Sequence, residues 1–158
     1  MIKLTRIDDR LVHGQVAFTW VPALSVDCLL VVNDKVAKDE FQKMTLNLAK
    51  PANTKLVIKT VADAILFLND EKNGKLNVLI LINSIKDAAT MAAGVPAITS
   101  INFGGIRGKA GSRLISKAIA ITDDDVPVLQ EMLQKNIELE IRQVPTDSKQ
   151  KVESLLDK

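Results

Sequence analysis

The residues best suited to chemistry lie together near the start of the chain, in residues 5–16 (TRIDDRLVHGQV). This segment contains two arginines, two aspartates and the only histidine of the protein, and apolar stretches flank it on both sides. The side chains concerned are Arg6, Asp8, Asp9, Arg10 and His13. An imidazole beside guanidinium groups, placed between a strand and the start of a helix, is well suited to handle an anion such as phosphate.

A cluster of this composition also has simpler interpretations. His13 could simply form hydrogen bonds with its neighbours at the start of a helix. The four charged side chains could pair with one another, because a buried charge loses solvation unless it is paired. A metal site is disfavoured, because one histidine, a cysteine in an apolar run (Cys28) and acids beside arginines form a weak ligand set. A serine or cysteine nucleophile is unsupported, because neither residue type adjoins the only available base.

The chemistry that fits one imidazole among cations is phosphoryl transfer. Neutral histidine is a competent nitrogen nucleophile, and Arg10 or Arg6 could neutralise the oxygens of a transferring phosphoryl group. Backbone amides near Gly14, at the start of the following helix, would add fixed donors. An aspartate, Asp8 or Asp9, could hold the ring tautomer or position an arginine, and the residues leave open which one does so.

A second unusual segment, residues 103–111 (FGGIRGKAG), holds four of the seven glycines. It is not a phosphate-cradling P-loop, because Lys109 stands where the second glycine of that pattern should be, and the dinucleotide-binding pattern is absent. A short G-x-x-G match to KH-type RNA binders disagrees with the fold and charge expected here. The segment is therefore either a tight structural connection or a loop, with Gly104 and Gly105, that lines the site or contacts a partner.

The composition is typical of one soluble domain covering residues 1–158. Aromatic residues make up only 3%, which argues against a surface that binds single-stranded nucleic acid by stacking its bases. The net charge of +2 is too small to create a large electrostatic field that would attract a polyanion. Cys28 is the only cysteine, so no disulfide framework exists and a reducing cytosol is expected. No targeting segment and no apolar run near the ~18 residues of a membrane span is visible, which favours a cytoplasmic location.

Apolar periodicity predicts an alternation of strands and helices along the whole chain. We expect strands at residues 2–7, 28–32, 55–59, 78–82, 97–102, 114–121 and 138–144, and helices at residues 16–24, 34–49, 61–68, 84–93, 123–135 and 148–156. In the second helix, Ala37, Phe41, Met44 and Leu48 share one face, and Ser84 is a candidate N-cap of the fourth. This order predicts an α/β fold: an open, mostly parallel twisted sheet of about seven strands with helices on both faces.

The predicted topology brings the two unusual segments together. In open α/β sheets, ligands bind outside the carboxyl ends of the strands, where the strand order reverses. Residues 8–14 leave the carboxyl end of the first strand, and residues 103–111 leave that of the fifth. We therefore expect both loops at one rim, as two walls of one site.

Residues 6–16 (RIDDRLVHGQV) resemble the phosphorylation-site motif of the IIB component of the bacterial sugar phosphotransferase system (PTS), mannose/fructose/sorbose family. The resemblance extends to residues 101–105 (INFGG), 115–117 (ISK) and 139–145 (LEIRQVP), and so covers essentially the full chain. The first motif is long and specific, and the later ones support it. Phe103 and residues 107–113 depart from the family pattern, which affects loop contacts more than the chemistry.

The resemblance implies a cytoplasmic phosphocarrier, peripherally associated with a membrane permease, that needs no metal and no cofactor. His13 would accept a phosphoryl group on Nδ1 from the IIA component and pass it to a sugar arriving through the IIC and IID membrane subunits. Because two proteins must reach the imidazole, it should be exposed, and the chain would be a free-standing subunit that could form a homodimer. The resemblance also implies that Arg10 steadies the phosphate. We expect the catalytic residues to be His13, Arg10, Arg6 and Asp8, and the phosphate-binding loop to include Asp9, Leu11, Val12, Gly14 and Gln15.

A different class of function stays open beside this one. A non-catalytic module could bind an anion or a phosphorylated metabolite through the same loop, with His13 as a simple hydrogen-bond donor. A phosphatase is less well supported, because the chain lacks an obvious second histidine or acid pair to hydrolyse an intermediate.

Overall fold

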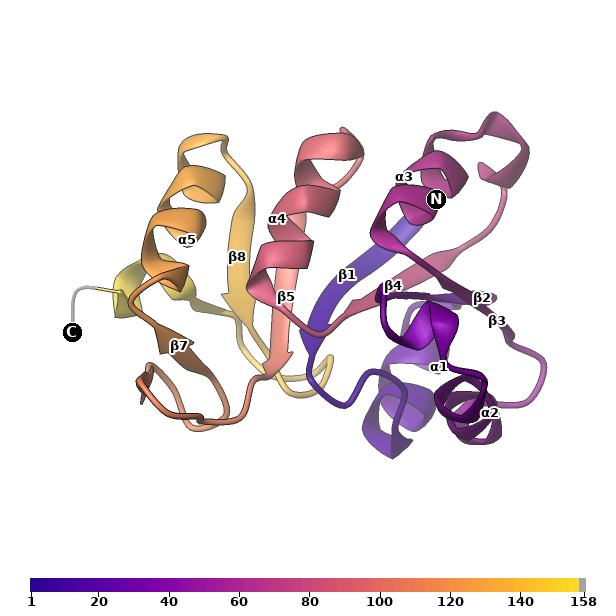
Figure 1. Ribbon diagram of the computed structural model, residues 1–158, viewed down its shortest axis with the longest axis horizontal. Helices are drawn as coiled ribbons and strands as arrows, with labels where there is room; N and C mark the ends of the chain where they lie inside the picture. The colour runs from indigo at the N-terminus through magenta and orange to yellow at the C-terminus, as the bar shows by residue number, and fades with distance from the viewer. Residues whose placement is uncertain (157–158) are drawn as a thin grey trace.

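The computed structural model, which describes residues 1–156, is built around one seven-stranded sheet (Figure 1). The strand order is β3-β2-β4-β1-β5-β8-β9, and every neighbouring pair is parallel except β8 and β9. The strands are β1 (Ile2–Asp8), β2 (Cys28–Val32), β3 (Lys55–Lys59), β4 (Val78–Ile82), β5 (Ser100–Gly105), β8 (Glu138–Ile141) and β9 (Gln150–Lys151). The expected mostly parallel α/β sheet is confirmed.

The aliphatic strands β2 and β4 form the interior of the sheet, and every residue of both is buried. Side chains alternate between faces, so that Leu30 and Ile80 join one apolar cluster and Leu29 and Leu79 join the other. Strand β1 lies between β4 and β5, where the strand order reverses. The carboxyl end of β1 is therefore at the point where open sheets usually bind ligands.

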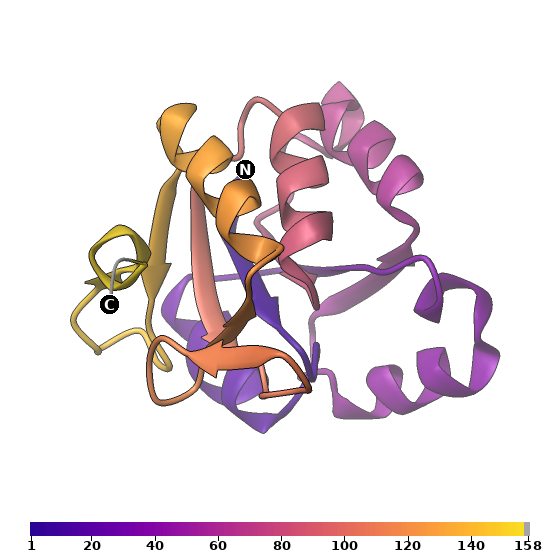
Figure 2. The same ribbon diagram turned by 60° about the vertical axis from the view of Figure 1, so that its left-hand side comes forward.

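Helices cover both faces of this sheet (Figures 1 and 2). The helices α3 (Val61–Asn69), α4 (Ile85–Gly94) and α5 (Asp125–Gln134) cover one face. The π-helix η1 (Val16–Trp20), α1 (Val21–Ala23) and α2 (Glu40–Ala49) cover the other. Ser84 caps α4 as predicted, and Asp39 and Thr60 cap α2 and α3 by accepting from the amide three residues later. Within residues 1–156, no helix is long and apolar enough to cross a membrane.

The helix predicted for residues 34–49 differs from the structure in two ways. Asp39 divides it into a short 3-10 helix (Val36–Lys38) and α2. The residues expected on its apolar face do share one side of α2, but Phe41, Met44 and Leu48 are 76%, 63% and 82% exposed. The helix packs on the sheet through Leu46 instead, which lies on the opposite side at 100° per residue.

The second half of the chain contains two further corrections. The strand expected at residues 114–121 is an antiparallel hairpin, β6 (Ser112–Leu114) and β7 (Ala120–Thr122), outside the main sheet. Its apolar run is interrupted by Ser116 and Lys117, which form the connection between the two strands. The helix expected at residues 148–156 is β9 followed by a 3-10 helix (Val152–Leu155), so β9 joins the main sheet and residues 114–121 do not.

Candidate active site

The loop that follows β1 turns back sharply on itself. The Leu11 amide donates to the Asp8 carbonyl at 3.0 Å, and Leu11 has a φ of 59°, in the left-handed region that residues other than glycine rarely adopt. Such a backbone costs about 1 kcal/mol or more. Burial of Leu11 and Val12, each 5% exposed, in the apolar cluster beneath η1 offsets this cost. The side chains of these two residues thus anchor the loop, and the turn brings His13 back against β1.

The central contact of the site joins His13 to Asp8. His13 Nε2 lies 2.7 Å from Asp8 Oδ2, and the two side chains are 12% and 2% exposed. A carboxylate only accepts hydrogen bonds, so Nε2 carries the proton and Nδ1 of the neutral ring keeps its lone pair. Nδ1 has no hydrogen-bond partner among the described residues. The ring is more buried than expected, and a partner can reach only a small part of it.

Asp8 is held by three neighbours at once. Its Oδ1 accepts from the Arg10 amide at 3.1 Å, while its Oδ2 accepts from Arg6 Nε at 3.3 Å as well as from His13. Burial raises the pKa of Asp8, but the hydrogen bond and charge of His13, the Arg10 amide and the Arg6 guanidinium together bring it below its usual value. Asp8 is therefore a fixed anion at neutral pH.

Arg6 faces the interior of the molecule, although it was expected to face phosphate. Its side chain is 0% exposed. The guanidinium donates to Asn102 Oδ1 at 2.7 Å, to the carbonyls of Arg142 and Gln143 at 3.0 and 3.4 Å, and lies 5.3 Å from the centre of the Trp20 ring. Burial lowers the pKa of Arg6, and the adjacent Asp8 carboxylate opposes that change. Arg6 is thus a buried counter-ion of Asp8.

The two glycines predicted as lining residues lie beside this buried pair. A side chain on Gly104 would place its Cβ 2.1 Å from Arg6 Cζ, so only glycine leaves room for the guanidinium. A Cβ on Gly105 would lie 3.8 Å from Asp8 Oδ1, an ordinary contact. The Gly105 carbonyl accepts from the Asp9 amide at 2.9 Å, which joins the two loops.

The outer side of the loop carries Asp9 and Arg10. Asp9 accepts from the amide and from Nε of Arg107, at 2.8 and 2.9 Å, so the loops after β1 and β5 meet at one rim as predicted. The Arg10 side chain is exposed and makes no hydrogen bond among the described residues. Beside it lies an open hollow of about 430 Å³. Its lining includes Asp9, Arg10, Gly104, Gly105, Ile106, Arg107, Gly108, Leu114, Lys117, Ala118 and Gln143.

The helix predicted after Gly14 begins next to the imidazole. The Ala17 amide donates to the His13 carbonyl at 3.0 Å, so the amides of Gly14, Gln15 and Val16 precede the first helical bond. These amides and the helix dipole favour an anion near His13. The Gln15 side chain turns back toward Arg6, with its Oε1 3.5 Å from the guanidinium.

Several residues of the site were not found by sequence reasoning. Asn102, Trp20, Glu140, Arg142 and Gln143 form the environment of Arg6, and Asn102 and Glu140 are each 1% exposed. The available signal was that Asn102, Glu140, Arg142 and Gln143 lie in residues 101–105 and 139–145, two of the segments that carry the family resemblance. Among the described residues, no group of three or more histidines, cysteines, aspartates and glutamates could hold a metal ion.

The fold and site together define an open-sheet α/β protein with one carboxylate-held histidine at the end of its first strand. Comparison with known families places residues 2–158 in the family described as PTS system sorbose subfamily IIB component, and the chain belongs to that family.

Relatives and solved structures agree with this assignment. The chain is 32% identical to the sorbose-specific EIIB component of Lacticaseibacillus casei, over 99% of this chain and 96% of that protein. It is 34% identical to the mannose-specific EIIAB component of Escherichia coli K12, over its whole length but only 49% of the relative, so it spans about half of that protein. The IIB domain of the Klebsiella pneumoniae sorbose permease superposes with a TM-score of 0.94 at 26% identity, covering 99% of this chain and 96% of that one.

Proposed function

We propose that this chain is the phosphocarrier IIB subunit of a sugar phosphotransferase system and works as one domain, residues 1–158. In this role His13 accepts a phosphoryl group from a phosphohistidine of a IIA component and passes it to a sugar. The family assignment supports the general role. The observation that carries the residue assignment is the 2.7 Å contact between His13 Nε2 and Asp8, which leaves Nδ1 as the nucleophile.

The first transfer requires no proton to move on His13. As the bond between phosphorus and the donor nitrogen breaks, the Nδ1 lone pair forms the new bond to phosphorus. The Nε2 proton stays in its hydrogen bond to Asp8, so the phosphorylated ring carries a positive charge that the buried carboxylate balances. The exposed Arg10 and the amides that begin at Gly14 are suitably placed for the phosphoryl oxygens.

The second transfer returns the site to its starting state. A sugar hydroxyl oxygen attacks phosphorus, the electron pair of the Nδ1–phosphorus bond returns to the ring, and the hydroxyl proton leaves to water. The partners of this step are the IIC and IID membrane subunits that deliver the sugar, which would place the chain in the cytoplasm at the permease. Neither a metal nor a cofactor has a part in these steps. Assembly into a homodimer stays a prediction that the elution mass of the purified chain would test.

The competing proposal is a module that binds an anion without covalent chemistry, and one experiment separates the two. The purified chain is incubated with phosphoenolpyruvate, enzyme I, the histidine-containing phosphocarrier protein and a cognate IIA, and its intact mass is then measured. A phosphocarrier gains one acid-labile phosphoryl group, on His13 by peptide mapping. A binding module keeps its original mass, and that result would reject the proposal.

A further inference from the structure

Every donor of the Arg6 guanidinium is already used inside the protein. Nε and one terminal nitrogen contact Asp8 Oδ2 at 3.3 Å each. The other terminal nitrogen donates to Asn102 and to the Arg142 carbonyl, while the first also donates to Gln15 Oε1 at 3.5 Å and to the Gln143 carbonyl at 3.4 Å. A guanidinium has five N–H groups, and these acceptors account for them. Arg6 could therefore reach a phosphoryl group only by abandoning buried partners.

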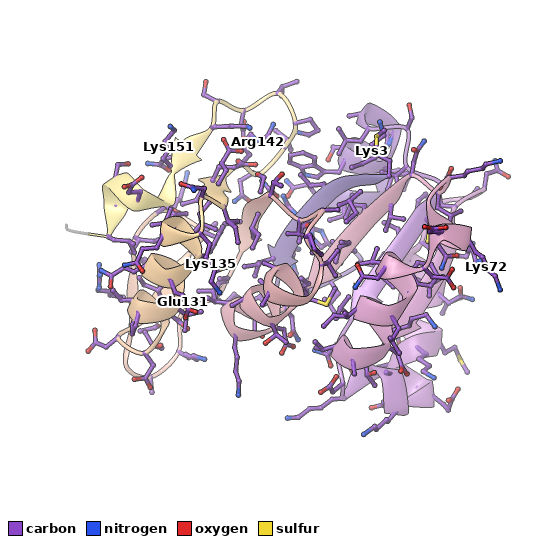
Figure 3. All side chains as sticks on the ribbon, turned by 90° about the horizontal axis from the view of Figure 1, so that it is seen from above. Lys3, Lys72, Glu131, Lys135, Arg142 and Lys151 are labelled. Atoms are coloured by element: carbon purple, nitrogen blue, oxygen red, sulfur yellow. The ribbon has the colours of Figure 1, made fainter. Side chains whose placement is uncertain are left out.

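Arg6 adjoins a layer of polar side chains that consists of Asn102, Glu140 and Arg142. Asn102 Nδ2 donates to Glu140 Oε1 at 3.1 Å, and Arg142 pairs with the same carboxylate at 2.8 Å. Both guanidinium groups lie near the Trp20 ring, with Arg6 Cζ 5.3 Å and Arg142 Cζ 5.1 Å from its centre, and Trp20 Nε1 donates to the Gln143 carbonyl. Arg142 is labelled in Figure 3, where it follows directly after β8. A buried network whose members are all satisfied holds its geometry closely.

Gly104 fixes where the guanidinium can lie. The Arg6 side chain crosses this residue so closely that an added Cβ would be 2.1 to 2.4 Å from three of its atoms. Among residues 1–156, Asp8 is the residue that hydrogen-bonds to both Arg6 and His13, so it connects this layer to the imidazole. A displacement of Arg6 would release Oδ2, the oxygen that accepts from His13 Nε2.

We propose that Arg6 is a positioning residue, which acts through Asp8 to hold His13 with Nε2 protonated and Nδ1 available for the phosphoryl group. Gly104 is then required because it has no side chain in the space that the Arg6 guanidinium occupies. The inference rests on the proposed function for its catalytic consequence, but the ring orientation can be measured without any phosphorylation. Misplacement of a reacting group by about 1 Å costs on the order of 10²-fold in rate, which sets the effect expected here.

The test uses the full chain labelled with nitrogen-15, because the only histidine gives a single pair of ring signals. The first two variants are Arg6→Met, which removes the charge, and Arg6→Lys, which keeps it. The third is Gly104→Ala, which keeps the arginine but adds a methyl group where its guanidinium lies. Gly108→Ala is the matched control, since its Cβ would meet only Ser112 Oγ, at 3.7 Å. Circular dichroism first confirms that each variant is folded, and Gly104→Ala serves where Arg6→Met does not fold.

In the wild type and in Gly108→Ala, we expect an Nε2-protonated ring with a slowly exchanging, downfield ring proton. In Gly104→Ala and Arg6→Met, that proton signal is lost and phosphorylation by IIA slows by about 10²-fold. Arg6→Lys restores part of the signal, because it keeps the charge without the paired donors. A folded Gly104→Ala or Arg6→Met protein with the wild-type ring signals overturns the inference, whatever its rate. A wild-type protein that is never phosphorylated rejects the proposed function, and the ring signals still decide the role of Arg6.

Discussion

Asp8 and Asp9 are neighbours in sequence, yet their side chains differ in burial and make different contacts. The Asp8 side chain is 2% exposed and contacts Arg6 and His13, whereas Asp9 is 20% exposed and pairs with Arg107, which is itself 79% exposed. The difference arises because β1 ends at Asp8, whose side chain is buried, whereas Asp9 belongs to the turn that follows and its carboxylate meets the loop after β5. The inner carboxylate orients the imidazole, and the outer one ties two loops together.

The two arginines of the motif divide in the same way. Arg6 lies on the inner side and is saturated with hydrogen bonds, while Arg10 lies on the outer side with its guanidinium in solvent. Breaking a buried pair leaves an uncompensated charge and costs about 3–5 kcal/mol, whereas an exposed pair contributes about 0–1 kcal/mol. Substitutions on the inner side should therefore affect both folding and chemistry, and those on the outer side should affect chemistry alone.

The largest effect should come from the imidazole itself. His13→Gln removes the nucleophile, while a glutamine amide can still donate to Asp8, so we expect an intact fold and no phosphorylation. The measurements are intact mass after incubation with IIA and a thermal melt against the wild type. Acid-labile phosphate on the folded variant would assign the chemistry to another residue.

On the inner side, Asp8→Asn should be nearly as damaging. The substitution removes the carboxylate that holds the ring proton on Nε2, and we expect the rate of phosphorylation to fall by about 10³-fold. It also leaves the buried Arg6 without its closest counter-charge, which should cost about 3 kcal/mol of unfolding free energy. Rapid-quench kinetics and urea denaturation measure the two effects. A large loss of stability with an unchanged rate would separate Asp8 from the chemistry.

On the outer side, Arg10→Ala should slow phosphorylation by about 10²-fold with a stability change within about 0.5 kcal/mol. The guanidinium is exposed and free of protein hydrogen bonds among residues 1–156, so its loss leaves no buried group unsatisfied. The same kinetic and denaturation measurements apply. A wild-type rate in the transfer from IIA would remove Arg10 from the mechanism.

The inner carboxylate also predicts how stability depends on pH. Because folding lowers the pKa of Asp8, its contribution is fully present above the unfolded value of about 3.9 and is lost as pH falls through the lower folded value. Asp8→Asn has no such group to protonate. The difference in unfolding free energy between the two proteins should therefore be constant near neutral pH and shrink at strongly acid pH. A difference that grows on acidification would contradict the geometry around Asp8.

Much of this arrangement could be predicted from the sequence. The aliphatic runs of β2 and β4 predict buried parallel strands, and the alternation of elements predicts that the loops after β1 and β5 share a rim. The spacing of Arg6 and Asp8 also puts them on one side of β1. Both sides of this part of β1 are buried, and the polar partners that let Arg6 be buried, Asn102 and Glu140, belong to strands far away in sequence. For that reason Arg6 was expected at the phosphate.

The helix α2 is a second case in which the sequence predicts an element but not which of its side chains are buried. Phe41, Met44 and Leu48 have the spacing of a buried stripe, but the helix packs through Leu46 and exposes the stripe. Periodicity identifies a helix and its faces, and only the neighbouring elements decide which face is covered. The hairpin of β6 and β7 is a further case, since neither of its strands joins the sheet that the apolar pattern suggested.

The smallest effect should come from the outermost contact. Arg107→Ala removes an ion pair in which Arg107 is 79% exposed, but the Arg107 amide still donates to Asp9 at 2.8 Å. We therefore expect less than about 0.5 kcal/mol in unfolding free energy and less than about a threefold change in rate. Asp9→Ala removes both contacts and should have the larger effect of the two. If Arg107→Ala slows phosphorylation as much as Arg10→Ala does, the outer side takes part in transfer through both arginines, and the loop after β5 then belongs to the reaction centre.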